Sequence, residues 1–200
     1  MAFPVKMILA SGSPRRRELL ESLGWVFEVR VPDVPEDPLP GESPCVACGR
    51  LARIKGASVA TNASPDTLVL AADTVVDLDG MLMGKPENPD DSFRMISLLN
   101  GRTHRVHSGV AVFWNERVAD AVVTSEVTFR RLGETDLRAY VDSGEGLDKA
   151  GAYAIQGWGA LLVESIRGCY FNIVGLPLSR VSSLLEELGI PVVSQWRVGS

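Results

Sequence analysis

Two predicted helix starts in this sequence carry opposite charges. Asn88-Pro89-Asp90-Asp91 has a capping residue, a proline and two acids, which suit the positive end of a helix dipole. Ser13-Pro14-Arg15-Arg16-Arg17 also has a capping residue and a proline, but three cations follow, each unfavourable there by about 0.3–1 kcal/mol. A bound anion would make these terms favourable and would use the free backbone N–H groups. The pattern favours an anion site, unless the arginines extend into solvent or pair with carboxylates elsewhere.

Two carboxylates and two lysines could complete such a site. Asp73 directly follows the apolar run Val-Leu-Ala-Ala, and ligands bind where buried strands end in open α/β sheets. Because Mg²⁺ takes one or two carboxylates together with phosphate oxygens, Asp73 and Glu36 are candidate metal ligands. Lys55 and Lys85 are candidate phosphate contacts. Taken singly, each of these four residues reads equally well as a turn, loop or surface residue.

The histidines and the Cys-x-x-Cys pair do not predict a metal site. His104 and His107 lie three residues apart in a β-rich segment, so they face opposite sides of the sheet. Cys45 and Cys48 stand in a helical stretch without a second cysteine pair. We therefore interpret them as small helix residues, with a weak metal or redox role as the alternative.

Strands and helices must position these residues. Apolar runs and turn signals predict strands at residues 7–10, 27–30, 69–72, 104–114, 118–129 and 160–166, and a hairpin over 75–83 that turns at Asp79-Gly80. Helical spacing predicts helices over 14–24, 43–60, 88–99, 134–143 and 177–188, the last ending at Gly189 and Pro191. In helix 43–60, Ala47, Leu51 and Ile54 recur at helical spacing. The mixture predicts an α/β or α+β protein around a mixed sheet.

Size and charge restrict the class of protein. We expect residues 1–200 to form one domain, and 46% hydrophobic residues are enough for a substantial core. No apolar run approaches the roughly 20 residues of a membrane span, and the first ten residues lack the order of a secretory signal. We therefore expect a cytoplasmic protein with no membrane partner. The net charge of −5 argues against a nucleic-acid partner.

Several motifs together resemble the Maf (septum formation protein) family of nucleotide pyrophosphatases. They occur in the family's order and cover nearly the whole chain: SGSPRRRELL from Ser11, LARIK from Leu51, ADTVV from Ala72, GKP from Gly84, GRTH from Gly101, LDKAGAYAIQG from Leu147 and NIVGLP from Asn172. One departure is Gly56, where the family usually has alanine after the lysine, and we expect it to matter little.

The resemblance implies a twisted mixed sheet with flanking helices, folded into two lobes around a central cleft in the manner of Maf and ITPase proteins. It also implies a homodimer and a divalent metal cofactor, Mg²⁺ or Mn²⁺, for hydrolysis between the α- and β-phosphates. Asp73 matches the family's proton acceptor, and Glu36 matches an acid near the metal. The phosphate- and substrate-contacting positions are matched by Ser11, Ser13, Arg16, Lys55 and Lys85.

Three further positions match those that the family uses for base selectivity. Arg15, Thr74 and Gln156 form the set that resembles the dTTP/UTP pyrophosphatase subgroup, whereas the 7-methyl-GTP subgroup tends to carry Trp, Gln and Glu there. The expected activity is hydrolysis of dTTP and UTP, or of modified pyrimidine nucleotides, to the monophosphate and pyrophosphate. Two alternatives stay open: a non-catalytic nucleotide-binding regulator of septum formation, and a pyrophosphatase for modified purine nucleotides.

Overall fold

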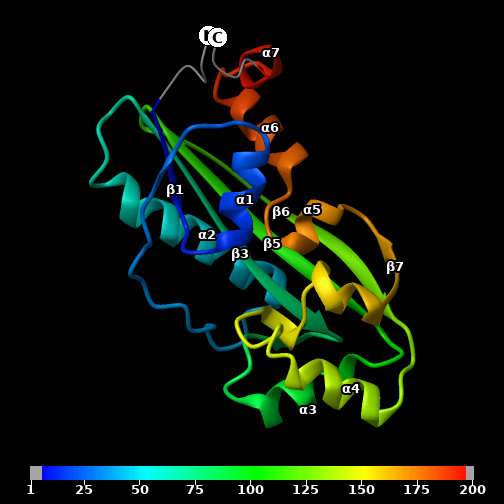
Figure 1. Cartoon of the computed structure of the whole chain (residues 1–200). Helices are drawn as coiled ribbons and strands as arrows, with labels where there is room; N and C mark the ends of the chain where they lie inside the picture. Colours follow the sequence, from blue (N-terminus) through cyan, green and yellow to red (C-terminus); the bar gives the residue numbers. More distant parts are fainter. Residues whose placement is uncertain (1–5, 197–200) are drawn as a thin grey trace.

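A mixed β-sheet of seven strands runs through the computed structural model, which describes residues 6–196 (Figure 1). The strand order is β2-β1-β3-β5-β6-β7, and β4 pairs with β3 beyond the end of β1. Residues 1–5, the start of the segment from which we argued against a secretory signal, lie outside the described residues. Over residues 6–196, none of the helices has both the length and the apolar character that a membrane crossing requires.

The strands are β1 (Lys6–Ala10), β2 (Glu28–Val29), β3 (Thr67–Leu78), β4 (Met81–Met83), β5 (Thr103–Trp114), β6 (Arg117–Phe129) and β7 (Val163–Arg167). The helices are α1 (Pro14–Ser22), α2 (Pro44–Ala60), α3 (Pro89–Leu99), α4 (Glu134–Asp142), α5 (Tyr170–Val174), α6 (Leu178–Glu187) and α7 (Val192–Gln195), with 3-10 segments at Ala150–Ala152 and Gly157–Leu162. The predicted α/β class with a mixed sheet is confirmed.

The first half of β3 is covered by helices on both faces. Leu70 belongs to an apolar core that includes Leu20 of α1 and residues of α6. Val69, the preceding residue, packs in a second core with Val59 of α2. Because successive side chains of a strand point to opposite faces, a continuous apolar run serves both helix layers.

The second half of the long strands carries a separate core. Val76 of β3 and Val106 of β5 pack with Ile96 of α3 and Leu137 of α4. Figure 1 shows α3 and α4 side by side below the sheet, far from α6 and α7. The two large cores are therefore carried on opposite ends of the same strands, as the predicted two-lobed architecture requires.

One edge of β3 is left without a neighbouring strand between these two cores. β1 pairs with β3 up to Ala71, and β4 pairs with it only from Val76 onwards. On the other side, β5 pairs with β3 continuously from Val69 to Asp77. Residues 72–75 therefore present an open strand edge in the middle of the sheet.

Local turn and capping signals predicted several features correctly. The β3–β4 hairpin turns at Asp79-Gly80, where the φ angles of 53° and 87° fit a type I′ turn. Asn88 caps α3, because its side chain accepts a hydrogen bond from the backbone N–H of Asp91 at 2.9 Å. Gly189, with a φ of 95°, follows the end of α6.

Other predicted boundaries are wrong. Asp73 does not follow a strand but lies within one, because β3 continues to Leu78 and pairs with β5 on both sides of Asp73. Residues 160–162 belong to a 3-10 segment, and the strand predicted there begins only at Val163. The helix predicted as the last one, α6, is followed by α7, for which Pro191 is the N-cap residue.

Of the three residues at helical spacing in α2, two are buried as expected, and one, Ile54, is not. Ile54 is 37% exposed, whereas the neighbouring Lys55 and Gly56 are buried. Gly56 provides room for an aromatic ring, since an added Cβ would lie 2.3 Å from Cε2 of Phe113. Lys55 is buried because it has carboxylate partners, which a periodicity argument based on apolar residues cannot detect.

Gly109 of β5 allows α2 to lie directly on the sheet. It is the register partner of Asp73, and a Cβ at this position would lie 2.3 Å from the carbonyl oxygen of Cys48. Backbone atoms cannot move aside as a flexible side chain can. The absence of a side chain at Gly109 therefore sets how closely α2 approaches β3 and β5.

We predict that Gly109→Ala destabilises the fold by about 1–3 kcal/mol, because the added methyl group must push α2 away from β5. Gly49→Ala is the matched control: its Cβ would meet only the tip of Val122, and alanine is the better helix former. Chemical denaturation followed by circular dichroism measures both. Equal stability of the two variants would contradict the close approach of helix and strand.

Candidate active site

A cavity of about 650 Å³ lies at the open edge of β3. This volume is within the roughly 300–1,000 Å³ of typical small-molecule sites and is sufficient for a nucleotide. The structure brings together in its lining all ten residues predicted as site residues: Ser11, Ser13, Arg15, Arg16, Glu36, Lys55, Asp73, Thr74, Lys85 and Gln156. The charge pattern of the sequence suggested that the helix start, two carboxylates and two lysines form one site, and the resemblance added the remaining residues.

The start of α1 is open toward the cavity. Ser13 occupies the capping position, but its side chain makes no capping hydrogen bond, in contrast to Asn88 at the start of α3. The backbone N–H groups of Arg15 and Arg16, in the first turn of the helix, have no intrahelical acceptor. The Ser13 hydroxyl and these N–H groups therefore remain available to an anion at the positive end of the helix dipole.

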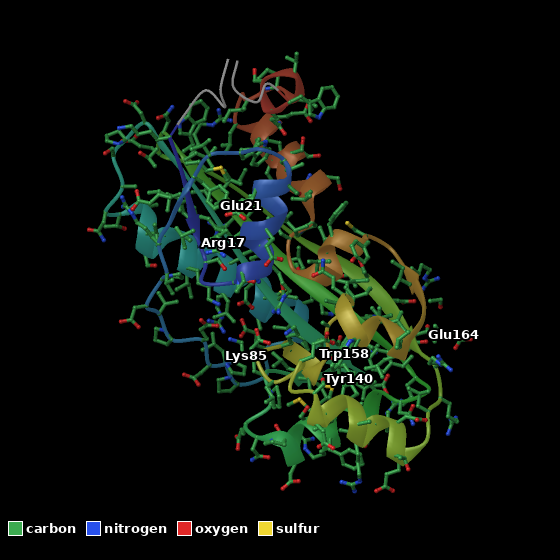
Figure 2. All side chains as sticks on the ribbon, in the orientation of Figure 1. Arg17, Glu21, Lys85, Tyr140, Trp158 and Glu164 are labelled. Atoms are coloured by element: carbon green, nitrogen blue, oxygen red, sulfur yellow. The ribbon has the colours of Figure 1, made fainter. Side chains whose placement is uncertain are left out.

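The three arginines of this helix start have different partners. Arg17 forms an exposed ion pair at 3.6 Å with Glu21 along α1 (Figure 2). Arg15 lines the cavity with 25% of its side chain exposed, 3.5 Å from Asp148. Arg16 is buried. The interpretation that one anion interacts with all three arginines is wrong for Arg17. Arg17 instead pairs with a carboxylate, which was the alternative.

Arg16 joins three segments of the chain behind the cavity. Its Nε donates to the Gly175 carbonyl at 2.9 Å, and its Nη1 donates to the Ser11 hydroxyl and the Ala72 carbonyl, both at 2.9 Å. Its Nη2 donates to the Thr74 hydroxyl at 3.0 Å. A guanidinium has five N–H donors, so these bonds leave one Nη2 hydrogen for a ligand. Arg16 thus stabilises the unpaired β3 edge, a role that the motif alone did not reveal.

The Thr74 hydroxyl is engaged within the protein. Besides accepting from Arg16, it lies 2.8 Å from the Ser108 hydroxyl and 3.4 Å from the Gly175 carbonyl. Ser108 is 0% exposed and donates to the carbonyl of Asn172 at 3.0 Å. An influence of Thr74 on the choice of base must therefore act through its backbone or through Arg16 and Gly175. Sequence reasoning missed Ser108, because nothing near it in the chain marks it as a partner of Thr74.

Lys55 lies between two carboxylates. Its Nζ is 2.7 Å from Oδ1 of Asp73 and 2.6 Å from Oε2 of Glu36. The Lys55 and Asp73 side chains are each 9% exposed, whereas that of Glu36 is 59% exposed. Asp73 has the same strand parity as Val69 and Ala71, so it faces α2, which carries Lys55. The cluster therefore combines a sheltered acid, a sheltered cation and an acid on a loop.

The donor set fits a divalent metal that a substrate helps to hold. Two carboxylate oxygens already converge on one cationic atom, Lys55 Nζ, and Mg²⁺ takes one or two carboxylates plus phosphate oxygens. Within residues 6–196, no three His, Cys, Asp or Glu residues are placed to hold a metal. Asp73 and Glu36 would therefore hold such an ion together with substrate and water oxygens.

Arg50 of α2 fixes the loop that carries Glu36. Its guanidinium donates to both carboxylate oxygens of Glu42 at 2.7 Å and to the carbonyl of Asp37 at 3.1 Å. The Glu42 side chain is only 6% exposed. These bonds from the Arg50 guanidinium restrict an otherwise irregular loop and so place Glu36 beside Lys55. None of the sequence motifs had identified Arg50 as a functional residue.

Lys85 and Gln156 approach the cavity from the other lobe. Lys85 lies on the connection between β4 and α3, exposed, and no carboxylate among residues 6–196 pairs with it (Figure 2). Gln156 is also exposed and precedes the 3-10 segment Gly157–Leu162. Trp158, two residues after Gln156, is 66% exposed and is absent from the cavity lining. Tyr153 does line the cavity, but its hydroxyl bonds His104 at 2.8 Å.

The two histidines have separate partners on the sheet. His107 lies 3.1 Å from Asp77 and 2.8 Å from the Thr124 hydroxyl. His104 packs edge-on against Phe129, and burial lowers its pKa to about 4, so the ring is neutral at physiological pH. Both rings therefore contribute to the structure of the sheet.

We predict that Arg16→Lys lowers the free energy of unfolding by roughly 2–4 kcal/mol, because an ammonium cannot satisfy the four acceptors, three of them buried, that the guanidinium fork bonds. Arg17→Lys, one residue further along the same helix, should change stability by less than about 0.5 kcal/mol, since its ion pair is exposed. Urea denaturation of both variants measures the difference. An Arg16→Lys protein as stable as Arg17→Lys would exclude the joining role of Arg16.

Comparisons with known proteins agree with this architecture. A family model described as Maf-like protein matches residues 6–188. A protein from Anaeromyxobacter dehalogenans is 48% identical over 191 residues, which cover 94% of this chain and 96% of the relative. A protein from Syntrophomonas wolfei is 46% identical, covering 92% and 98%, and one from Thermus thermophilus is 48% identical, covering 92% and 95%. All three are named dTTP/UTP pyrophosphatase.

The match extends over nearly the full length of both this chain and its relatives, so it includes every segment that contributes to the cavity. The motifs that suggested the resemblance lie within the same matched region. This chain belongs to the Maf-like protein family.

Proposed function

We propose that this protein is a nucleoside triphosphate pyrophosphatase that hydrolyses dTTP and UTP to the nucleoside monophosphate and pyrophosphate. The observation that carries the proposal is the meeting, in one cavity, of an uncapped helix start with the Asp73–Lys55–Glu36 cluster. The helix start can bind a polyphosphate, and the cluster provides an acid that can accept a proton during hydrolysis. Relatives 46–48% identical to this chain bear the name of this activity.

The phosphate chain is proposed to bind along the start of α1. Ser11, Ser13 and the free N–H groups of the first turn provide neutral donors, and Lys85 provides a cation from the opposite wall. Lys55 lies at the junction between this surface and the carboxylates. The scissile bond between the α- and β-phosphates would thus lie near Asp73.

In the proposed reaction, Asp73 accepts a proton from a water molecule as the water oxygen attacks the α-phosphorus. The bond from the α-phosphorus to the bridging oxygen breaks, and pyrophosphate leaves with that oxygen. Lys55, Lys85 and the remaining Arg16 hydrogen stabilise the negative charge that develops on the leaving group. A divalent metal, Mg²⁺ or Mn²⁺, held by Asp73 and Glu36 would supply further neutralisation of phosphate charge.

The base is proposed to be selected at the wall formed by Arg15, Thr74 and Gln156. An amide side chain offers both a donor and an acceptor, which complement the O4 and N3–H edge that uracil and thymine share. Cytosine has the opposite pattern at these atoms and would leave polar groups unpaired. Modified pyrimidine nucleotides that keep this edge are proposed substrates as well.

The cluster around Asp73 separates this proposal from a non-catalytic regulator of septum formation. A protein that only binds nucleotides has use for the helix start but none for a sheltered acid, Asp73, paired with a sheltered lysine. We also propose that residues 1–200 act as one domain, in the cytoplasm, as a homodimer. The net charge of −5 supports a protein without nucleic-acid or membrane partners.

We predict that a panel of nucleoside triphosphates, assayed with Mg²⁺ or Mn²⁺ for pyrophosphate release, will show dTTP and UTP as the best substrates. CTP should be at least about tenfold poorer in kcat/KM, because a mispaired base edge costs more than one hydrogen bond. Preference for ITP or for GTP derivatives would instead identify the protein as a pyrophosphatase of modified purine nucleotides.

We predict that Asp73→Asn lowers kcat by about 10²–10⁴-fold, because the amide cannot accept the proton, while the dissociation constant for UTP changes only a few-fold. Asp66→Asn is the control, since Asp66 is exposed just before β3 and remote from the cavity lining. Single-turnover kinetics and calorimetric titration separate the two quantities. Parallel loss of binding and turnover in Asp73→Asn would argue against a catalytic role.

A further inference from the structure

Asp148 contacts two cations in the wall of the cavity. Its Oδ1 is 2.5 Å from Nζ of Lys149, and its Oδ2 is 3.5 Å from Nη1 of Arg15. All three residues line the cavity, and Asp148 and Lys149 come from the segment between α4 and the 3-10 segment Ala150–Ala152. The contact with Arg15 therefore links this segment to the start of α1 across the cavity.

The two cations are sheltered, whereas the carboxylate is exposed. The side chains of Arg15 and Lys149 are 25% and 14% exposed, and that of Asp148 is 61% exposed. Lys149 has a second partner, because its Nζ donates to the carbonyl of Glu145 at 2.5 Å. If the Asp148 side chain turned to solvent, Lys149 would thus keep its bond to Glu145, and both cations would lose their carboxylate partner.

Asp148 is ionised at neutral pH. Partial burial raises its pKa, but the hydrogen bond from Lys149 and the charges of Lys149 and Arg15 outweigh that effect, so the pKa lies below its ordinary value. An exposed carboxylate paired with lysine or arginine contributes little to stability, and an anion of higher charge can replace it. A polyphosphate is such an anion.

We propose that Asp148 is an internal counter-ion that occupies, in the free protein, the place of a substrate phosphate oxygen, and that Lys149 is a further phosphate-binding residue. This inference rests on the proposed function, because it assigns the ligand of the same cavity as a polyphosphate. Substrate phosphate displaces the Asp148 carboxylate, which turns to solvent, and then bonds Lys149. Arg15, no longer paired with Asp148, is free to contact the base.

A different role for Asp148, permanent orientation of the two cations, has the opposite consequence. A counter-ion competes with the ligand, so its neutralisation strengthens anion binding. An orienting residue assists the ligand, so its neutralisation weakens anion binding. The sign of the change on Asp148→Asn therefore decides between them.

The test uses inorganic pyrophosphate as the probe, titrated calorimetrically into the full-length protein without metal, so that no turnover is needed. Asp148→Asn should bind pyrophosphate about fivefold more tightly, the factor expected from removing one charge about 4 Å away in water-like surroundings. Lys149→Met should bind it about tenfold more weakly, through the loss of a charged hydrogen bond. In the double variant Asp148→Asn/Lys149→Met, the increase in pyrophosphate affinity caused by Asp148→Asn should be smaller than in the presence of Lys149.

Asp142→Asn at the end of α4 is the matched control, because it removes one exposed acid of the same region that does not line the cavity. Thermal unfolding of each variant by circular dichroism verifies that the fold is kept. The inference is overturned if Asp148→Asn binds pyrophosphate more weakly than the unaltered protein, or gains no more affinity than Asp142→Asn does. It is also overturned if Lys149→Met binds pyrophosphate as tightly as the unaltered protein. Failure of the unaltered protein to hydrolyse any triphosphate would instead overturn the proposed function, and it leaves the pyrophosphate titration interpretable.

Discussion

The unpaired edge of β3 at residues 72–75 is the constraint on which the rest of this structure depends. A strand edge within a sheet must find hydrogen-bond partners or remain open to solvent and ligands. Here the Arg16 guanidinium bonds the carbonyl of Ala72, and the same group reaches Ser11 and Gly175. One side chain thus joins the start of α1, the middle of the sheet and the end of α5. The remaining length of the edge forms the floor of the cavity.

The proposed catalytic acid lies on the face of this strand segment that α2 covers. Asp73 points toward α2 because of its strand parity, and Gly109 lets α2 lie close enough for Lys55 to reach it. Arg50 of the same helix holds the loop that brings Glu36 to Lys55. The helix that forms part of the core therefore also supplies the charge partner and positions the loop, so the geometry of the acids follows from helix–sheet packing.

The sequence predicted well the features that have local causes. The hairpin turn at Asp79-Gly80 and the capped start of α3 depend on residues next to one another, and both are where they were expected. The resemblance identified ten residues that line one cavity, from motifs far apart in the chain. The strand boundary at Asp73 was misplaced, because an acid was taken as the end of an apolar run although Lys55 neutralises it.

The partners of these residues could not be predicted. The three arginines of α1 look equivalent in the sequence, yet Arg17 pairs with Glu21 and does not line the cavity. Arg16 and Arg15 both line it, Arg16 as a buried side chain and Arg15 as a partly exposed one. Their roles depend on Gly175 and Asp148, more than a hundred residues away. Contacts of the folded chain therefore offset part of the unfavourable dipole term at this helix start, and the proposed substrate phosphate would offset it further.

In the proposed reaction, the cavity directs water to the α-phosphorus of a pyrimidine nucleoside triphosphate. Hydrolysis of UTP in water enriched in oxygen-18, with mass spectrometry of both products, tests it most directly. We expect the label in the nucleoside monophosphate and none in pyrophosphate. Label in pyrophosphate, or release of the terminal phosphate alone, would contradict it.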